Sequence, residues 1–92
     1  MDFKEYLDSM FRQFYPHEQD SLDSKVAKYL ILIGLHRSLA EHFDRPPLSA
    51  IPDAQRIFQE TIEDLESQLR AVRVRQAIRE RNEQRNVDAG MP

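Results

Sequence analysis

The sequence predicts an all-α fold, in which a short N-terminal helix packs on a long antiparallel helical hairpin and dimerisation completes the resulting three-helix bundle. Three segments carry apolar residues at the three- and four-residue spacing of one helix face. Prolines separate these segments, and the 92 residues include two glycines, too few for a β-rich fold with many tight turns. This length suits one domain, which we expect to span residues 1–82 and to end in a flexible tail at 83–92.

The first helix is predicted over about residues 2–15, because Pro16 disfavours helical geometry at the residue before it. Its apolar face consists of Phe3, Tyr6, Leu7, Met10, Phe11, Phe14 and Tyr15. A small soluble protein rarely leaves so many large apolar side chains in water. We therefore expect this helix to pack on the hairpin, and the alternative is a detachable binding element.

The second helix is predicted over about residues 21–43, with Asp20 or Ser21 as its N-cap and Pro46 and Pro47 beyond its end. Its main apolar face consists of Leu22, Val26, Tyr29, Leu30, Ile33, Ala40 and Phe43. Ile31 and Leu35 project from the opposite side. A helix that is apolar almost all round is central in a bundle or contributes to an interface.

The third helix is predicted over about residues 53–82, with Pro52 in its first turn and Ser49 or Ile51 near the cap. Its apolar stripe consists of Ala54, Ile57, Phe58, Ile62, Leu65, Leu69 and Val72. Beyond Val72 the stripe fails, and Val74 and Ile78 lie on roughly the opposite side.

Helix length predicts where a partner would bind. At about 1.5 Å per residue the three helices measure roughly 20, 35 and 45 Å, so the third outruns the second. The overhang is expected to carry Val74, Ile78 and several arginines, and the first helix is too short to cover both outer faces. We therefore predict that Ile31, Leu35, Val74 and Ile78 bind a protein partner or a second copy of the chain.

Charge is divided unevenly along the chain. Residues 1–69 have seven Lys and Arg against thirteen Asp and Glu, a net charge of −6, whereas residues 70–92 have six Arg against three acids, a net charge of +3. The candidate contacts to an anionic partner are Arg70, Arg73, Arg75, Arg79 and Arg81. Three interpretations stay open: a solvated helix end near the C-terminal dipole, an acidic protein partner, or nucleic acid. No aromatic residue in the segment offers a platform for base stacking.

The sequence predicts no catalytic, cofactor or metal site. There is no cysteine, and His36 and His42 lie six residues apart, about 120° around one helix, so they cannot share a metal without other ligands. We expect His36 to be a hydrogen-bonded structural histidine at the edge of the core. The paired carboxylates of the chain are expected to be solvated. Acid–base catalysis needs a cleft that shifts their pKa values, and three helices in a chain of this size offer little room for such a cleft.

These observations favour a non-enzymatic protein-interaction module that acts as a dimer or as a small adaptor or chaperone. The alternative is a nucleic-acid-binding regulator that uses the arginine-rich helix. The longest apolar run, Tyr29 to Leu35, is far shorter than the roughly 20 residues that cross a bilayer, so we predict a cytoplasmic protein without a membrane partner.

Overall fold

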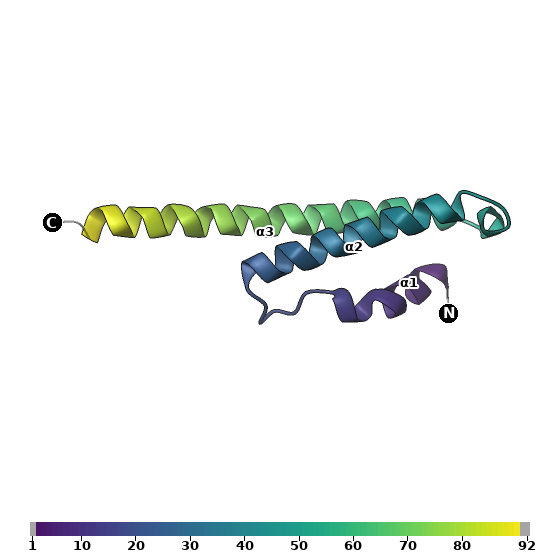
Figure 1. Ribbon diagram of the computed structural model, residues 1–92, viewed down its shortest axis with the longest axis horizontal. Helices are drawn as coiled ribbons and strands as arrows, with labels where there is room; N and C mark the ends of the chain where they lie inside the picture. Colours follow the sequence, from purple (N-terminus) through teal and green to yellow (C-terminus); the bar gives the residue numbers. More distant parts are fainter. Residues whose placement is uncertain (1, 91–92) are drawn as a thin grey trace.

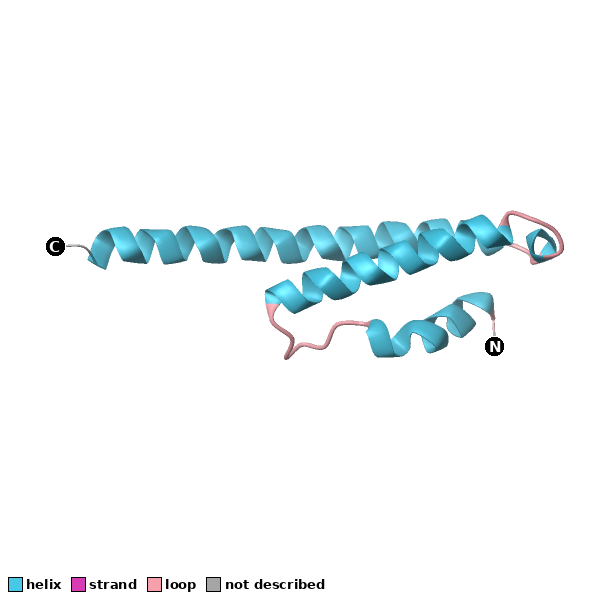
Figure 2. Cartoon of the chain, in the orientation of Figure 1, coloured by secondary structure: helices cyan, strands magenta, loops and turns pink. Residues whose placement is uncertain are grey.

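A computed structural model describes residues 2–90, with side chains described for residues 2–84. Three α-helices, α1 (Phe3–Phe11), α2 (Leu22–Phe43) and α3 (Ala54–Gly90), alternate with the 3-10 turns Arg12–Phe14 and Leu48–Ala50. The part of the chain between residues 2 and 90 contains no strand (Figure 2). α2 and α3 form an antiparallel hairpin, and α1 runs along it (Figure 1). The predicted all-helical class and hairpin are confirmed.

The N-terminal ends of α1 and α2 are capped by side chains. The carboxylate of Asp2 accepts a hydrogen bond from Glu5 N at 2.8 Å, and the hydroxyl of Ser21 accepts one from Ser24 N at 3.1 Å. Such caps satisfy amide donors that have no partner within the helix. At its other end α1 tightens into a 3-10 turn, and Tyr15 is extended before Pro16.

Asp20 links the connector between α1 and α2 to helix α2 through hydrogen bonds of its side chain. Its carboxylate accepts hydrogen bonds from Lys28 Nζ at 2.7 Å and from His17 N at 2.9 Å. These donors, the Lys28 ammonium above all, hold the pKa of Asp20 below its ordinary value because they stabilise the charged form.

We expect the substitution Asp20→Asn to lower the free energy of unfolding near neutral pH. A carboxyl whose pKa is lowered by folding stabilises the protein above its unfolded pKa, and this stabilisation is lost as the pH falls through the folded pKa. Urea titrations of both proteins should therefore differ above pH about 4 and converge in stronger acid. A difference that persists unchanged at low pH would contradict this role.

α3 begins and ends later than the sequence predicts. Pro52 and Asp53 precede the helix, and Asp53 has φ 59°, a left-handed conformation that aspartate tolerates better than most residues. The helix continues to Gly90, so residues 83–90 are helical instead of forming the predicted tail, while residues 91–92 lie outside the described residues. The polar composition of residues 83–92 is the reason that a tail is predicted. However, no Gly or Pro occurs between Ala54 and Gly90, so no helix-breaking residue ends the helix before Gly90.

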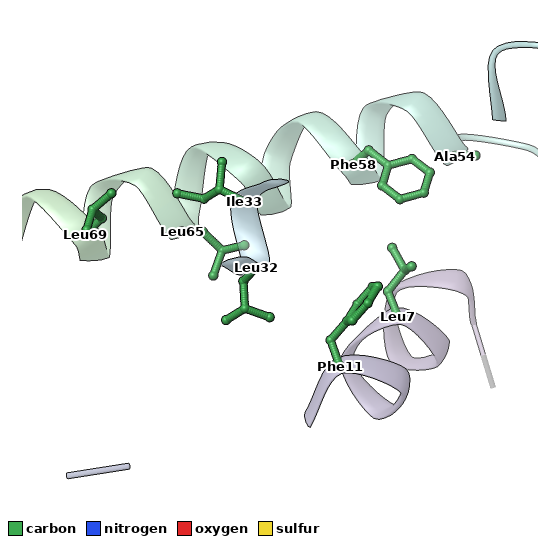
Figure 3. Close-up of a cluster of buried hydrophobic side chains, with 8 residues drawn as sticks. All are labelled: Leu7, Phe11, Leu32, Ile33, Ala54, Phe58, Leu65 and Leu69. Atoms are coloured by element: carbon green, nitrogen blue, oxygen red, sulfur yellow. The ribbon is translucent and has the colours of Figure 1, made fainter. Parts of the chain in front are cut away.

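The core lies where the three helices meet (Figure 3). Phe58 is fully buried, with its ring 5.4 Å from that of Phe3 on α1 and 5.2 Å from that of Phe43 on α2. The buried residues are Leu7, Phe11, Leu32, Ile33, His36, Ala54, Phe58, Thr61, Leu65, Leu69 and Val72. The predicted burial of four residues, Ile33, Phe58, Leu65 and Leu69, is confirmed.

Leu30 belongs to the predicted packed face and is instead 47% exposed. His36 is fully buried, at the centre of the packed face of α2 rather than at its edge. At about 100° per residue Leu30 lies roughly 120° from His36, which places it outside the packed face. The prediction is wrong because it locates the face from apolar residues alone.

The imidazole of His36 is enclosed by α1 and its own helix. Nδ1 lies 2.7 Å from Leu32 O, and the ring centroid is 4.7 Å from that of Phe11. We assign the proton to Nδ1, since the carbonyl can only accept, and Nε2 then has an acceptor lone pair that is buried without a partner.

We expect His36→Leu to raise the free energy of unfolding by about 1 kcal/mol. An unsatisfied buried polar atom costs on the order of 1–3 kcal/mol, and leucine fills a similar volume without one. The control His36→Ala should instead destabilise the protein by about 2–4 kcal/mol because it leaves a cavity. Urea unfolding measures both, and a destabilised His36→Leu would show that Nε2 makes a favourable interaction.

The molecule is elongated and exposes much surface for its size. It measures 68 × 20 × 14 Å, with a radius of gyration of 18.0 Å against about 12 Å for a compact chain of this length. Its accessible surface is 6884 Å², whereas a folded monomer of this mass exposes about 5,600 Å². The difference exceeds the roughly 800 Å² that each partner contributes to a standard interface.

The N-terminus of α2 shows how far the hairpin extends along α3. Asp23, in the first turn of α2, accepts a hydrogen bond from Gln76 Nε2 at 2.6 Å and lies 3.8 Å from Arg79. The hairpin therefore reaches residue 79 of α3. Val74 and Ile78 therefore lie on the part of α3 that runs beside α2, and the prediction that they lie on the overhang is wrong, because side chains of α3 as far as Arg79 reach the first turn of α2.

Candidate interaction surfaces

One exposed apolar surface lies on α1, on the side that faces away from α3. The opposite side of α1 carries Lys4, Asp8 and Arg12, which line a groove against α3. Tyr6 and Met10 therefore project away from α3, and both side chains are exposed, by 52% and 40%.

The neighbouring side of α2 continues this surface. Ile33 lies against α3, so Ile31 and Leu35 lie on the side of α2 away from it. Phe11 packs on His36, and α1 is antiparallel to α2, which brings the end of α1 alongside this part of α2. We call the combined surface the α1–α2 face; its members are Tyr6, Met10, Ile31 and Leu35, together with Phe14, which is 37% exposed in the turn that follows α1.

The α1–α2 face carries almost no net charge. Ser24, Ala27 and Ser38 lie beside Ile31 and Leu35 on α2, and the nearby ammonium of Lys28 is already paired with Asp20. A neutral surface of aromatic and branched side chains is typical of the centre of a protein–protein interface.

Gly34 lies exposed in the middle of α2. Glycine in a helix interior destabilises the helix by about 1 kcal/mol relative to alanine. A Cβ at this position would meet nothing within 4 Å, so packing within the single chain gives no reason for glycine.

The predicted interface residues differ in exposure. Ile31 is 50% exposed, Val74 58% and Ile78 50%, whereas Leu35 is half-buried and packs on the core. α1 therefore leaves uncovered part of the outer face of α2, at Ile31, and part of the outer face of α3, at Val74 and Ile78. Tyr6, Met10 and Phe14, which the sequence analysis assigned to packing, belong to the α1–α2 face. The sequence feature that could have indicated their exposure is the width of the apolar face of the first helix.

The five predicted anion-binding arginines are exposed but are not gathered on one side. Arg79 lies 3.8 Å from Asp23 and 3.8 Å from Glu83, and Arg73 borders a surface groove beside Glu66. At about 100° per residue, Arg70 and Arg75 lie roughly 140° apart around α3. The structure therefore does not form a single basic face from this segment.

A polar groove of about 360 Å³ separates α1 from the first half of α3. Asp8 and Arg12 line one wall, Glu60 and Asp64 the other, and Tyr15 closes one end. Burial, followed by the charges of Asp8 and Asp64, raises the pKa of Tyr15 above its ordinary value. Sequence reasoning missed this groove because it depends on the placement of α1.

Among the described residues, no group of three or more His, Asp and Glu side chains is arranged to hold a metal ion. None of the described helices combines the length and the apolar character needed to cross a bilayer. No protein-family model, curated protein or solved structure matches the chain.

Proposed function

We propose that the protein is a non-enzymatic helical interaction module, acting as a dimer or as a small adaptor or chaperone, which docks apolar helix surfaces on a protein partner. The observation that carries this proposal is the exposed α1–α2 face. An elongated small chain that leaves Tyr6, Met10 and Ile31 in water gains apolar burial when another helix covers them.

The occupant that best fits the α1–α2 face is an amphipathic helix. Two roughly antiparallel helices present the face, and a third helix can lie along them with its apolar residues spaced by three and four. Acidic or basic partners gain little here, because the face offers few charges to pair. Gly34 supports close approach of a backbone beside Ile31.

A photocrosslinker placed at Ile31 in cells, followed by identification of the crosslinked protein, tests this proposal. The same crosslinker at Glu41, an exposed residue on α2, serves as a matched control. We expect a helical protein to be crosslinked from position 31 and not from position 41. Equal crosslinking from both positions, or none, would refute the α1–α2 face as a docking site.

The double substitution Met10→Glu and Ile31→Glu should weaken binding of that partner at least tenfold while leaving the fold intact. Both side chains are exposed, so their effect on the free energy of unfolding should stay within about 0.5 kcal/mol. Calorimetric titration and urea unfolding measure the two effects. Unchanged affinity would show that the partner binds elsewhere.

The alternative is a nucleic-acid-binding regulator, which the five exposed arginines of α3 would support. Phosphate contacts release counterions, so affinity for duplex DNA or RNA should fall steeply as salt rises. Titrations at low and physiological salt distinguish the two proposals, because docking on the neutral α1–α2 face depends little on salt.

A further inference from the structure

A second regular stripe runs along the outer side of α3, opposite the side that packs on α2. Its positions alternate in steps of four and three, the spacing of a helix–helix seam. We call it the outer α3 stripe, and its members are Glu60, Asp64, Ser67, Ala71, Val74, Ile78 and Arg81. All seven are exposed in the single chain, where Glu60 lies 3.4 Å from Arg56 and Asp64 accepts a hydrogen bond from Gln68 at 2.8 Å.

The order of residue types along the outer α3 stripe is polarised. It begins with the acids Glu60 and Asp64, passes through small residues at its centre, and ends with apolar side chains and Arg81. Small residues at the centre allow two helix backbones to approach closely. The opposite charges at the two ends indicate how a partner helix would align.

We propose that two copies of the chain pair through their outer α3 stripes, antiparallel, about a two-fold axis between residues 70 and 71. In this register Arg81 lies opposite Glu60 of the partner subunit, and Val74 lies opposite Ser67 of the partner subunit. Each attractive charge pair occurs twice, because a two-fold interface uses the same surface on both protomers. Val74 of each copy then covers Ser67 of the other, whereas Ile78 lies opposite position 63, between Glu60 and Asp64.

The charge order selects this arrangement over a parallel one. Parallel pairing would place Glu60 against its own copy and Arg81 against its own copy, which is repulsive at both ends. The α1–α2 face has no comparable charge order, so it does not specify a register for self-pairing. The surface excess over a typical monomer is also large enough for the area of such an interface.

α1 lies beside the acidic end of the outer α3 stripe. Glu60 and Asp64 border the open groove between α1 and α3, to which α1 contributes Asp8 together with Lys4 and Arg12. Arg56 also lies 3.4 Å from Glu60, so the arginine of the second copy would compete with Arg56 for this carboxylate.

Charge-reversal variants studied by sedimentation equilibrium test the pairing. The wild-type chain should dimerise, and Glu60→Arg or Arg81→Glu alone should raise the dimer dissociation constant at least tenfold. An equimolar mixture of the two variants should form heterodimers, since the arginine introduced in one chain then faces the glutamate introduced in the other. Combining both reversals in one chain should also restore the homodimer, which excludes misfolding as the cause.

Single cysteines test the direction of pairing, because the natural chain has none. Ala71→Cys lies beside the proposed axis and should form an intermolecular disulfide rapidly under oxidation. Ile78→Cys should not, because its copies would lie about 22 Å apart along the helix axis, beyond the reach of a disulfide. Equal crosslinking of both variants would establish parallel pairing and overturn the proposal.

A wild-type chain that stays monomeric at millimolar concentration would also overturn it, as would a mixture of the reversed variants that does not associate. Neither result bears on the α1–α2 face, whose test uses Met10 and Ile31 and a different binding partner.

Discussion

Truncation of Phe58 to alanine is expected to lower the free energy of unfolding by about 3–5 kcal/mol, close to the whole stability of a domain of this size. The ring is fully buried and contacts Phe3 on α1 and Phe43 on α2, at centroid distances of 5.4 and 5.2 Å. Its loss leaves a cavity where all three helices converge. Thermal and urea unfolding followed by circular dichroism measure the effect.

Leu30→Ala is the matched control for this prediction. Leu30 is 47% exposed and lies outside the packed face of α2, so its truncation should cost less than about 1 kcal/mol. Similar losses for both variants would mean that the packed face of α2 is rotated from the one described. A small loss for Phe58→Ala alone would mean that α1 and α3 do not converge there.

Helix periodicity was sufficient to predict the hairpin. In α3 the spacing of Phe58, Leu65 and Leu69 located the packed side, because every buried position of this helix except Thr61 is apolar. In α2 the same reasoning placed the predicted packed face to one side of the observed one, because the buried residue at the centre of the observed face is a histidine. A polar residue that packs through its ring cannot be recognised from hydropathy, and its burial depends on Phe11, which is distant in sequence.

The interaction surfaces were partly predictable for a similar reason. Ile31, Val74 and Ile78 stand apart from the main stripes of their helices, and this mismatch is visible in the sequence. The participation of Met10 could not be predicted from the sequence. The apolar face of α1 is wider than its contact with the other helices, so one edge of the face stays exposed, and tertiary packing determines which edge this is. The groove beside Tyr15 likewise requires the position of α1.

Removal of residues 1–16 is expected to abolish cooperative unfolding. α1 contributes Leu7 and Phe11 to the core and covers His36, and each large side chain that it buries contributes about 1.5–3 kcal/mol. Together they approach the stability of the domain. The truncated chain should therefore show weakened helical circular dichroism, a broad thermal transition and increased binding of a hydrophobic dye.

Full-length Leu7→Asp distinguishes the loss of packing from the loss of chain length. A charge in the buried position of Leu7 should detach α1 and give the same broad transition, whereas Tyr6→Asp, on the exposed side of the helix, should not. If both the truncated chain and Leu7→Asp unfold as sharply as the wild type, α1 is a detachable binding element. If they lose cooperativity, the core holds Tyr6, Met10 and Phe14 in fixed positions beside α2, so a partner helix meets a preorganised surface and no ordering of α1 opposes its binding.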